Sequence, residues 1–167
     1  APCDWVECEK ATIAVGKMYG PAYVRFGREN VVTVTTDKTP FEIGKAEVYR
    51  EGKDVTVVAC GVMVFEALKA AEEMSKDGVE LEVINCHTIK PIDIRTIIES
   101  AKKTGKVVTA EEHQINGALG SAVAEALSEN CPVPLARVGV LDTFGESGKP
   151  DELMDAYSLR SKDIVRK

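Results

Sequence analysis

The sequence has 167 residues, of which 44% are hydrophobic and 29% are charged. This length fits one complete domain, so any second domain is partial, and the composition excludes both a disordered chain and a membrane-embedded one. The formal net charge is -6 with acidic and basic residues interleaved, so no basic stripe is available to bind a nucleic-acid backbone.

No apolar run approaches the roughly 20 residues that span a bilayer, and the first ten residues lack a basic segment followed by an apolar one. The cysteines form no C-x-x-C pair and no spacing typical of zinc ligands. They are Cys3, Cys8, Cys60, Cys86 and Cys131. We therefore expect a cytoplasmic protein with reduced thiols and no bound metal, and with neither a membrane nor a nucleic acid as partner.

The first predicted element is a helix that begins at Asp4. Asp4 and Glu7 have the spacing of a capping box, in which each acid accepts a backbone amide proton at the helix start. Apolar residues then recur on one face until a Gly-Pro pair, ending at Pro21, stops the helix. Residues 22 to 26 predict a strand. The polar stretch at residues 30 to 40 predicts a linker and a domain boundary.

After the linker, strand patterns and helix patterns alternate, which is typical of an α/β sheet with crossover helices. The first of five predicted strands, over residues 42 to 50, alternates polar and apolar residues, as an edge strand with one solvated face does. The other four predicted strands are mostly apolar and lie at 55–60, 79–84, 106–110 and 135–140.

Helical spacing of apolar residues predicts a crossover helix between successive strands after the first. One such helix runs from Val64 to Met74, a second follows Pro91 and a third follows Gly117. A shorter helix is predicted over residues 151 to 157, where a Pro-Asp pair marks its start.

Six short motifs follow one another along the chain. They are residues 20–29 (GPAYVRFGRE), 41–46 (FEIGKA), 88–93 (TIKPID), 111–113 (EEH), 117–120 (GALG) and 144–150 (FGESGKP). In this order and spacing they resemble the C-terminal region of transketolases over essentially the whole chain. The IGKA, TIKPID and EEH patterns also resemble the β-subunits of 2-oxoacid decarboxylases and deoxyxylulose-phosphate synthase, which are the enzyme alternatives. The arginine at position 28 and the Ser-Gly-Lys-Pro end favour transketolase.

The resemblance implies a three-layer α/β/α fold with a five-stranded mixed sheet of order 1-3-2-4-5, in which the first strand is antiparallel. It also implies a division of the chain. Residues 1–29 would be the last helix and strand of a truncated pyrimidine-binding domain, residues 30–40 a linker, and residues 41–167 the transketolase C-terminal domain. The chain would then be a fragment of a longer protein.

The function that the resemblance implies is the transfer of a two-carbon ketol unit between sugar phosphates in the pentose phosphate pathway, with thiamine diphosphate and Mg²⁺ or Ca²⁺ as cofactors. The chain contains no Gly-Asp-Gly motif for the metal and diphosphate, and no segment with the activating glutamate. We therefore expect no catalytic residue and no bound cofactor in this chain alone. It would serve assembly, as a homodimer or with the N-terminal section of transketolase.

The resemblance places one substrate contact in the chain. Arg28 matches the arginine that grips the terminal phosphate of the sugar, a task suited to a planar guanidinium. The alternative is a surface ion pair between Arg28 and Glu29 or Asp37, which is the common situation of an exposed arginine.

With the implied strand order, four residues flank the switch point, where open α/β sheets bind ligands. These candidate crevice ligands are Gly61, Glu111, Glu112 and His113. A free-standing ligand-binding or interaction domain that uses this crevice is the non-enzyme alternative. The glycine pair of the 117–120 motif could bind phosphate through free helix amides, or it could allow close packing of helix on strand.

Overall fold

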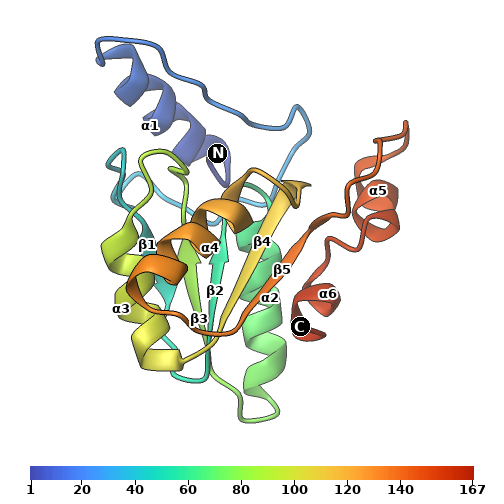
Figure 1. Cartoon of the computed structure of the whole chain (residues 1–167). Coiled ribbons are helices and arrows are strands. Elements are labelled where there is room, and N and C mark those ends of the chain that lie inside the picture. Colours follow the sequence, from blue (N-terminus) through green and yellow to red (C-terminus); the bar gives the residue numbers. More distant parts are fainter.

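The computed structural model describes residues 1–167 and contains a five-stranded sheet with helices on both faces (Figure 1). The strand order is β1-β3-β2-β4-β5, β1 is antiparallel to β3, and the other pairs are parallel. The strands are β1 (Glu47–Arg50), β2 (Val55–Ala59), β3 (Leu81–Asn85), β4 (Val107–Gln114) and β5 (Leu135–Val140). The predicted fold class and strand order are confirmed.

The helices are α1 (Trp5–Gly16), α2 (Met63–Ser75), α3 (Ile94–Thr104), α4 (Leu119–Asn130), α5 (Pro150–Ala156) and α6 (Ser161–Val165). The predicted crossover helices and the predicted helix after residue 150 are therefore present. Helix α6 was not predicted from the sequence, because its five residues are too short to show a helical period. None of the helices combines the length and the apolar character that a membrane span requires.

The sheet has a buried core on each face because successive residues of β2 point to opposite sides. Val57 packs in a cluster with α2, whereas Val58 packs in a second cluster with α3 and α4. Both valines are fully buried, and each such side chain stabilises the fold by about 1.5 to 3 kcal/mol. This two-sided burial explains why β2 is apolar at every position except Thr56.

Two strand boundaries differ from the prediction. Strand β1 begins at Glu47 rather than at residue 42, because Gly44 has a positive φ of 86° and the Lys45 amide closes a turn onto the carbonyl of Glu42 at 3.1 Å. Strand β4 continues to Gln114, which pairs with Val140 of β5 after an irregular register. The sheet therefore extends past residue 110 on one side only.

The strand predicted over residues 22 to 26 is wrong for this chain, because residues 17 to 46 contain no helix or strand. A strand needs a hydrogen-bonded neighbour, and no other segment makes a backbone hydrogen bond to residues 19 to 32. Residues 19 to 32 make a single hydrogen bond to the rest of the chain, from the guanidinium of Arg25 to the carbonyl oxygen of Glu112. The segment passes over the carboxyl edge of the sheet, from α1 towards α5 (Figure 1).

The predicted helix start at Asp4 is confirmed. The Oδ1 atom of Asp4 accepts the Glu7 amide at 2.9 Å, while the Glu7 side chain reaches the amide of Cys3 at 2.6 Å rather than that of Asp4. The Oδ2 atom of Asp4 also accepts the amides of Val34 and Thr35, at 2.8 and 2.6 Å. The predicted linker thus folds back along α1 and is fastened to its first turn.

Candidate functional site

Glu111 lies at the carboxyl edge of the sheet, but its side chain is turned inward and is only 1% exposed. Its two carboxylate oxygens accept the backbone amides of Leu119 and Gly120, at 2.9 and 2.8 Å, in the first turn of α4. Burial raises the pKa of this carboxyl, and these two amides act in the opposite direction. Glu111 therefore occupies the position that a bound anion would take at this helix end.

In the 117–120 motif only Gly120 serves close packing, whereas Gly117 has a positive φ of 82° and open space around it. A Cβ atom on Gly120 would lie 2.9 Å from the side chain of Arg137 and 3.0 Å from Oγ1 of Thr109. Because the amides at this turn already bind Glu111, they do not form a phosphate site.

Gly61 follows β2 at the switch point, where Ala1 at the start of the chain covers it. Its amide donates to the carbonyl of Ala1 at 3.1 Å, and the amino nitrogen of Ala1 donates to the carbonyl of His87 at 2.8 Å. Cys3, two residues further on, is buried in the core on the α2 face. The first residues of the chain thus join the carboxyl ends of β2 and β3, next to the switch point between β2 and β4.

Glu112 and His113 are exposed at the end of β4. The Nδ1 atom of His113 lies 3.2 Å from the carbonyl of Gln114, and the carbonyl of Glu112 accepts the hydrogen bond from Arg25. The four candidate crevice ligands consequently do not converge on one point. Glu111 binds α4, Gly61 lies under Ala1, and the other two face solvent.

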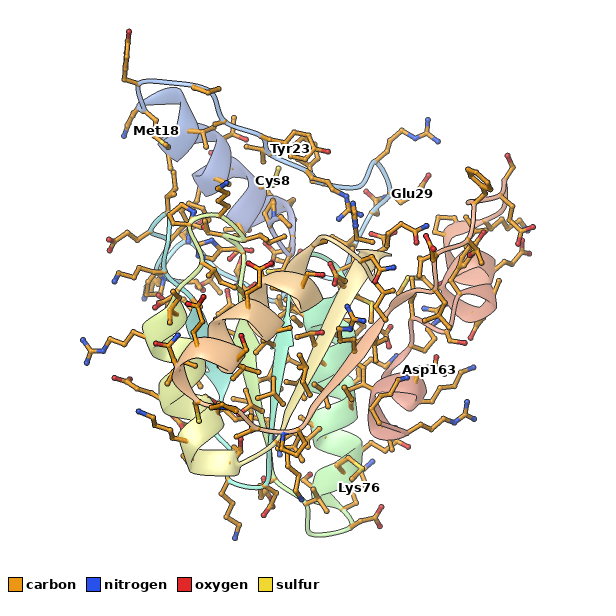
Figure 2. The ribbon with its side chains drawn as sticks, viewed as in Figure 1. Cys8, Met18, Tyr23, Glu29, Lys76 and Asp163 are labelled. Carbon is orange, nitrogen blue, oxygen red and sulfur yellow. The ribbon has the colours of Figure 1, made fainter.

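Arg28 is the most exposed of the candidates, with 96% of its side chain accessible. Its nearest acidic group is Glu29, at 3.9 Å, and an ion pair this open to solvent contributes little. Arg28 lines a surface hollow of about 530 Å³, to which Glu112 and the region of α5 also contribute. In Figure 2, Glu29 lies on the same segment, which approaches the side of the molecule that carries α5.

The charges around this hollow distinguish Arg28 from its neighbour Arg160. The guanidinium of Arg160 lies 2.8 Å from the carboxylate of Asp151 and 3.6 Å from that of Glu66, and these partners raise its pKa. Arg160 therefore holds α5 and α6 against α2. Arg28 has no comparable partner, so its guanidinium is free to bind an anion from solution.

The residues of this chain do not fit a thiamine-diphosphate and metal site. No group of three or more histidine, cysteine, aspartate or glutamate side chains is arranged to hold a metal ion. The start of α4, where a diphosphate could otherwise bind, is filled by Glu111. Burial also raises the pKa of the Cys60 thiol to about 12, so this thiol is protonated at neutral pH.

Arg25 is the residue that the sequence argument missed. It lines a different hollow from Arg28, of about 600 Å³, together with Glu111 and His113. The signal was the repeated arginine in Arg25-Phe26-Gly27-Arg28, in which the family resemblance gives a role only to the second arginine.

Comparison with known proteins places these features in a family. The chain is 52% identical over 165 residues to the 6-deoxy-6-sulfo-D-fructose transketolase subunit SqwH of Clostridium sp. strain MSTE9, covering 99% of this chain and 51% of that protein. It is 38% identical to a protein of Methanocaldococcus jannaschii described as a transketolase C-terminal section, covering 100% of this chain and 53% of that one.

A solved structure described as the inactive β4 tetramer of a split-gene transketolase superposes with a TM-score of 0.95 at 44% identity, over 99% of this chain and 54% of that chain. The chain therefore spans about half the length of the relatives it matches. The model of the transketolase C-terminal domain family matches residues 44–164. On this evidence, the chain belongs to the transketolase C-terminal domain family.

Proposed function

We propose that this chain is the C-terminal half of the C-terminal section of a split transketolase. The intact enzyme would move a two-carbon ketol unit between sugars with the help of thiamine diphosphate. The observation that carries this proposal is similarity over 98% or more of the chain to proteins named as transketolase sections or subunits, each about twice as long.

In this proposal the cofactor is held outside the chain, and the chain contributes assembly contacts and one substrate contact. An exposed apolar surface on α1 and the segment after it supports a role in assembly, because large apolar side chains rarely remain in water without a partner. Its residues and their exposed fractions are Trp5 (63%), Ile13 (51%), Met18 (46%), Tyr19 (105%), Tyr23 (86%) and Phe26 (61%). The partners would be the N-terminal section of the enzyme and further copies of this chain.

The substrate contact in this proposal is Arg28, which would hold the terminal anion of the sugar. Its exposed guanidinium has no tight ion pair, and a planar guanidinium fits an oxyanion with two parallel hydrogen bonds. Sugar phosphates of the pentose phosphate pathway are one substrate class. The SqwH relative is named for a sugar whose terminal group is a sulfonate. Both groups present oxygens that the same arginine can hold.

The test is reconstitution of the intact protein with an N-terminal transketolase section, thiamine diphosphate and Mg²⁺. Ketol transfer to glycolaldehyde is measured from a ketose phosphate and from a 6-deoxy-6-sulfo ketose. Transfer from at least one donor is expected, and the preferred donor identifies the terminal anion. Absence of transfer from both donors by a correctly assembled complex would contradict the proposal. As a control, the 167-residue chain should show no calorimetric binding of thiamine diphosphate with Mg²⁺.

A further inference from the structure

We propose that Arg25 is a positioning residue for Arg28. It fastens the segment that carries Arg28 to the end of β4, and so sets the place at which the terminal anion of the sugar binds. This inference rests on the proposed function of Arg28. It adds a residue to which neither the sequence pattern nor the comparisons assign a role.

The first observation is that the segment has one attachment. Among all residues from 19 to 32, the hydrogen bond from Nη2 of Arg25 to the carbonyl oxygen of Glu112 is the only one to the rest of the chain. Residues 17 to 46 have no sheet or helix to hold them. Within this chain, the position of Arg28 over the α/β core therefore depends on Arg25.

The second observation is that the anchor is rigid. Strand β4 pairs with β2 on one side and β5 on the other, and Glu111, next to Glu112, is held by two amides of α4. The carbonyl of Glu112 thus lies between two held positions of β4, which are Glu111, bound to α4, and Gln114, paired with Val140 of β5. An arginine has several donors in a rigid fork, so it can hold such a carbonyl in one orientation.

The third observation is the distance along the chain. Arg28 is three residues after Arg25, and three residues span at most about 11 Å of extended backbone. Glu112 also lines the hollow that Arg28 lines. The anchor point and the proposed anion site are therefore neighbours, and loss of the anchor frees Arg28 to move away from the hollow.

Arg25 itself is less suited to bind the sugar. Its side chain is half-buried, one of its donors is committed to Glu112, and it lines the hollow on the Glu111 side rather than the one beside Arg28. Its charge also acts on buried Glu111, where it lowers the carboxyl pKa against the larger effect of burial. Arg25 thus faces the core while Arg28 faces solvent.

The experiment uses the reconstituted enzyme with four variants: Arg25→Ala, Arg25→Lys, Arg28→Ala and the double variant Arg25→Ala/Arg28→Ala. Arg95→Ala is the matched control, because Arg95 is an exposed arginine whose side chain binds only Glu99 of its own helix. For each protein, KM and kcat are measured first for the preferred anionic donor. They are then measured for two acceptors, glycolaldehyde and a phosphorylated sugar, and compared. Hydrogen exchange is followed at the amides of residues 26 to 30.

We expect Arg25→Ala to raise KM for the anionic sugars by about five- to tenfold, less than the roughly ten- to hundredfold expected for Arg28→Ala. Arg25→Lys should recover part of the loss, and Arg95→Ala should behave as wild type. The double variant should be no worse than Arg28→Ala alone, because a positioning residue has no effect once the residue it positions is absent. Exchange at residues 26 to 30 should be faster in Arg25→Ala.

If the fold-increases in KM of the two single variants multiply in the double variant, Arg25 acts on the substrate by itself, and the positioning role is overturned. Unchanged exchange and unchanged KM in Arg25→Ala would overturn it as well. If the wild-type complex transfers no ketol unit, the proposed function fails. Hydrogen exchange of Arg25→Ala against Arg95→Ala then decides separately whether Arg25 holds the segment.

Discussion

The carboxylate of Glu111 lies 2.8 Å from the backbone nitrogen of Gly120, and so joins β4 to the first turn of α4. A second oxygen of the same carboxylate accepts the amide of Leu119. Both donors belong to buried residues, and the side chain of Glu111 is itself only 1% exposed. The partial positive charge at the N-terminus of α4 is thus neutralised by a carboxylate of the protein itself.

Replacement of this carboxylate should destabilise the fold. In Glu111→Gln one side-chain oxygen remains as an acceptor. The NH2 group that replaces the other oxygen is a donor, and it would face a backbone N–H of α4. We expect the free energy of unfolding to fall by about 1.5 to 3 kcal/mol, the range for hydrogen bonds to charged groups. Urea denaturation measures this change. Glu112→Gln is the control, since its exposed side chain makes no hydrogen bond, and equal effects at the two positions would refute the capping role.

Glu7 should be the residue that docks α1 onto the sheet. Its buried carboxylate accepts from Nδ2 of Asn85 at 2.7 Å and from the Cys3 amide at 2.6 Å. Glu7→Ala leaves the Cys3 amide without this partner and leaves Nδ2 of Asn85 with the hydroxyl of Tyr49, at a cost of about 2 to 3 kcal/mol. Hydrogen exchange should then become faster throughout α1, while Glu9→Ala, on the exposed side of the same helix, should leave it unchanged. Slow exchange of α1 in Glu7→Ala would contradict this assignment.

Asp4 should make stability depend on pH in the acid range. Burial alone would raise its pKa, but hydrogen bonds from Glu7, Thr35 and Val34 outweigh burial and lower the pKa below the ordinary value. The unfolded chain then binds a proton more readily than the folded one. The contribution of Asp4 is therefore present above its unfolded pKa of about 3.9, and it is lost as the pH falls through the lower folded pKa.

The check is urea denaturation of Asp4→Asn and wild type from neutral pH down to about pH 2. At neutral pH the variant should be less stable by about 1 to 2 kcal/mol. The difference should shrink as the pH falls, because wild-type Asp4 also loses its charge. Asp37→Asn, at an exposed position of the predicted linker, should show no such convergence. A difference that stays constant with pH would show that charge on Asp4 is not what stabilises this turn.

Arg28→Ala should weaken the binding of sugars with a terminal anion in the intact enzyme. The expected loss is about 1.5 to 3 kcal/mol, which corresponds to a rise in KM of roughly ten- to hundredfold. Arg28→Lys should recover only part of the loss, because an ammonium lacks the planar fork of the guanidinium. Steady-state kinetics with phosphorylated or sulfonated donors measure the change. Glycolaldehyde as acceptor offers no anion, so at a saturating concentration of donor the KM and kcat for glycolaldehyde should hardly differ. Equal losses for both acceptor classes would make Arg28 a structural residue.

The sequence by itself determined the elements whose signals are local. The carboxylate of Asp4 caps α1 because the amide it binds is only three residues away. Strand β2 lies within its predicted range because a run of β-branched residues favours a strand that is buried on both faces, and β5 spans residues 135 to 140 as predicted. The family resemblance added the order of the strands and the antiparallel first strand, which the sheet confirms.

Only the tertiary structure decided which groups meet across the chain. Residues 22 to 26 have the composition of a strand, yet they form none here, because a strand depends on a neighbour that this segment lacks. The sequence made Glu111 a candidate ligand, but in the fold its carboxylate accepts backbone amides eight and nine residues away. The bond from Arg25 to Glu112 joins residues 87 apart. Contacts of this range depend on how β4 and the N-terminal segment are packed, and a local sequence pattern contains no information about that packing.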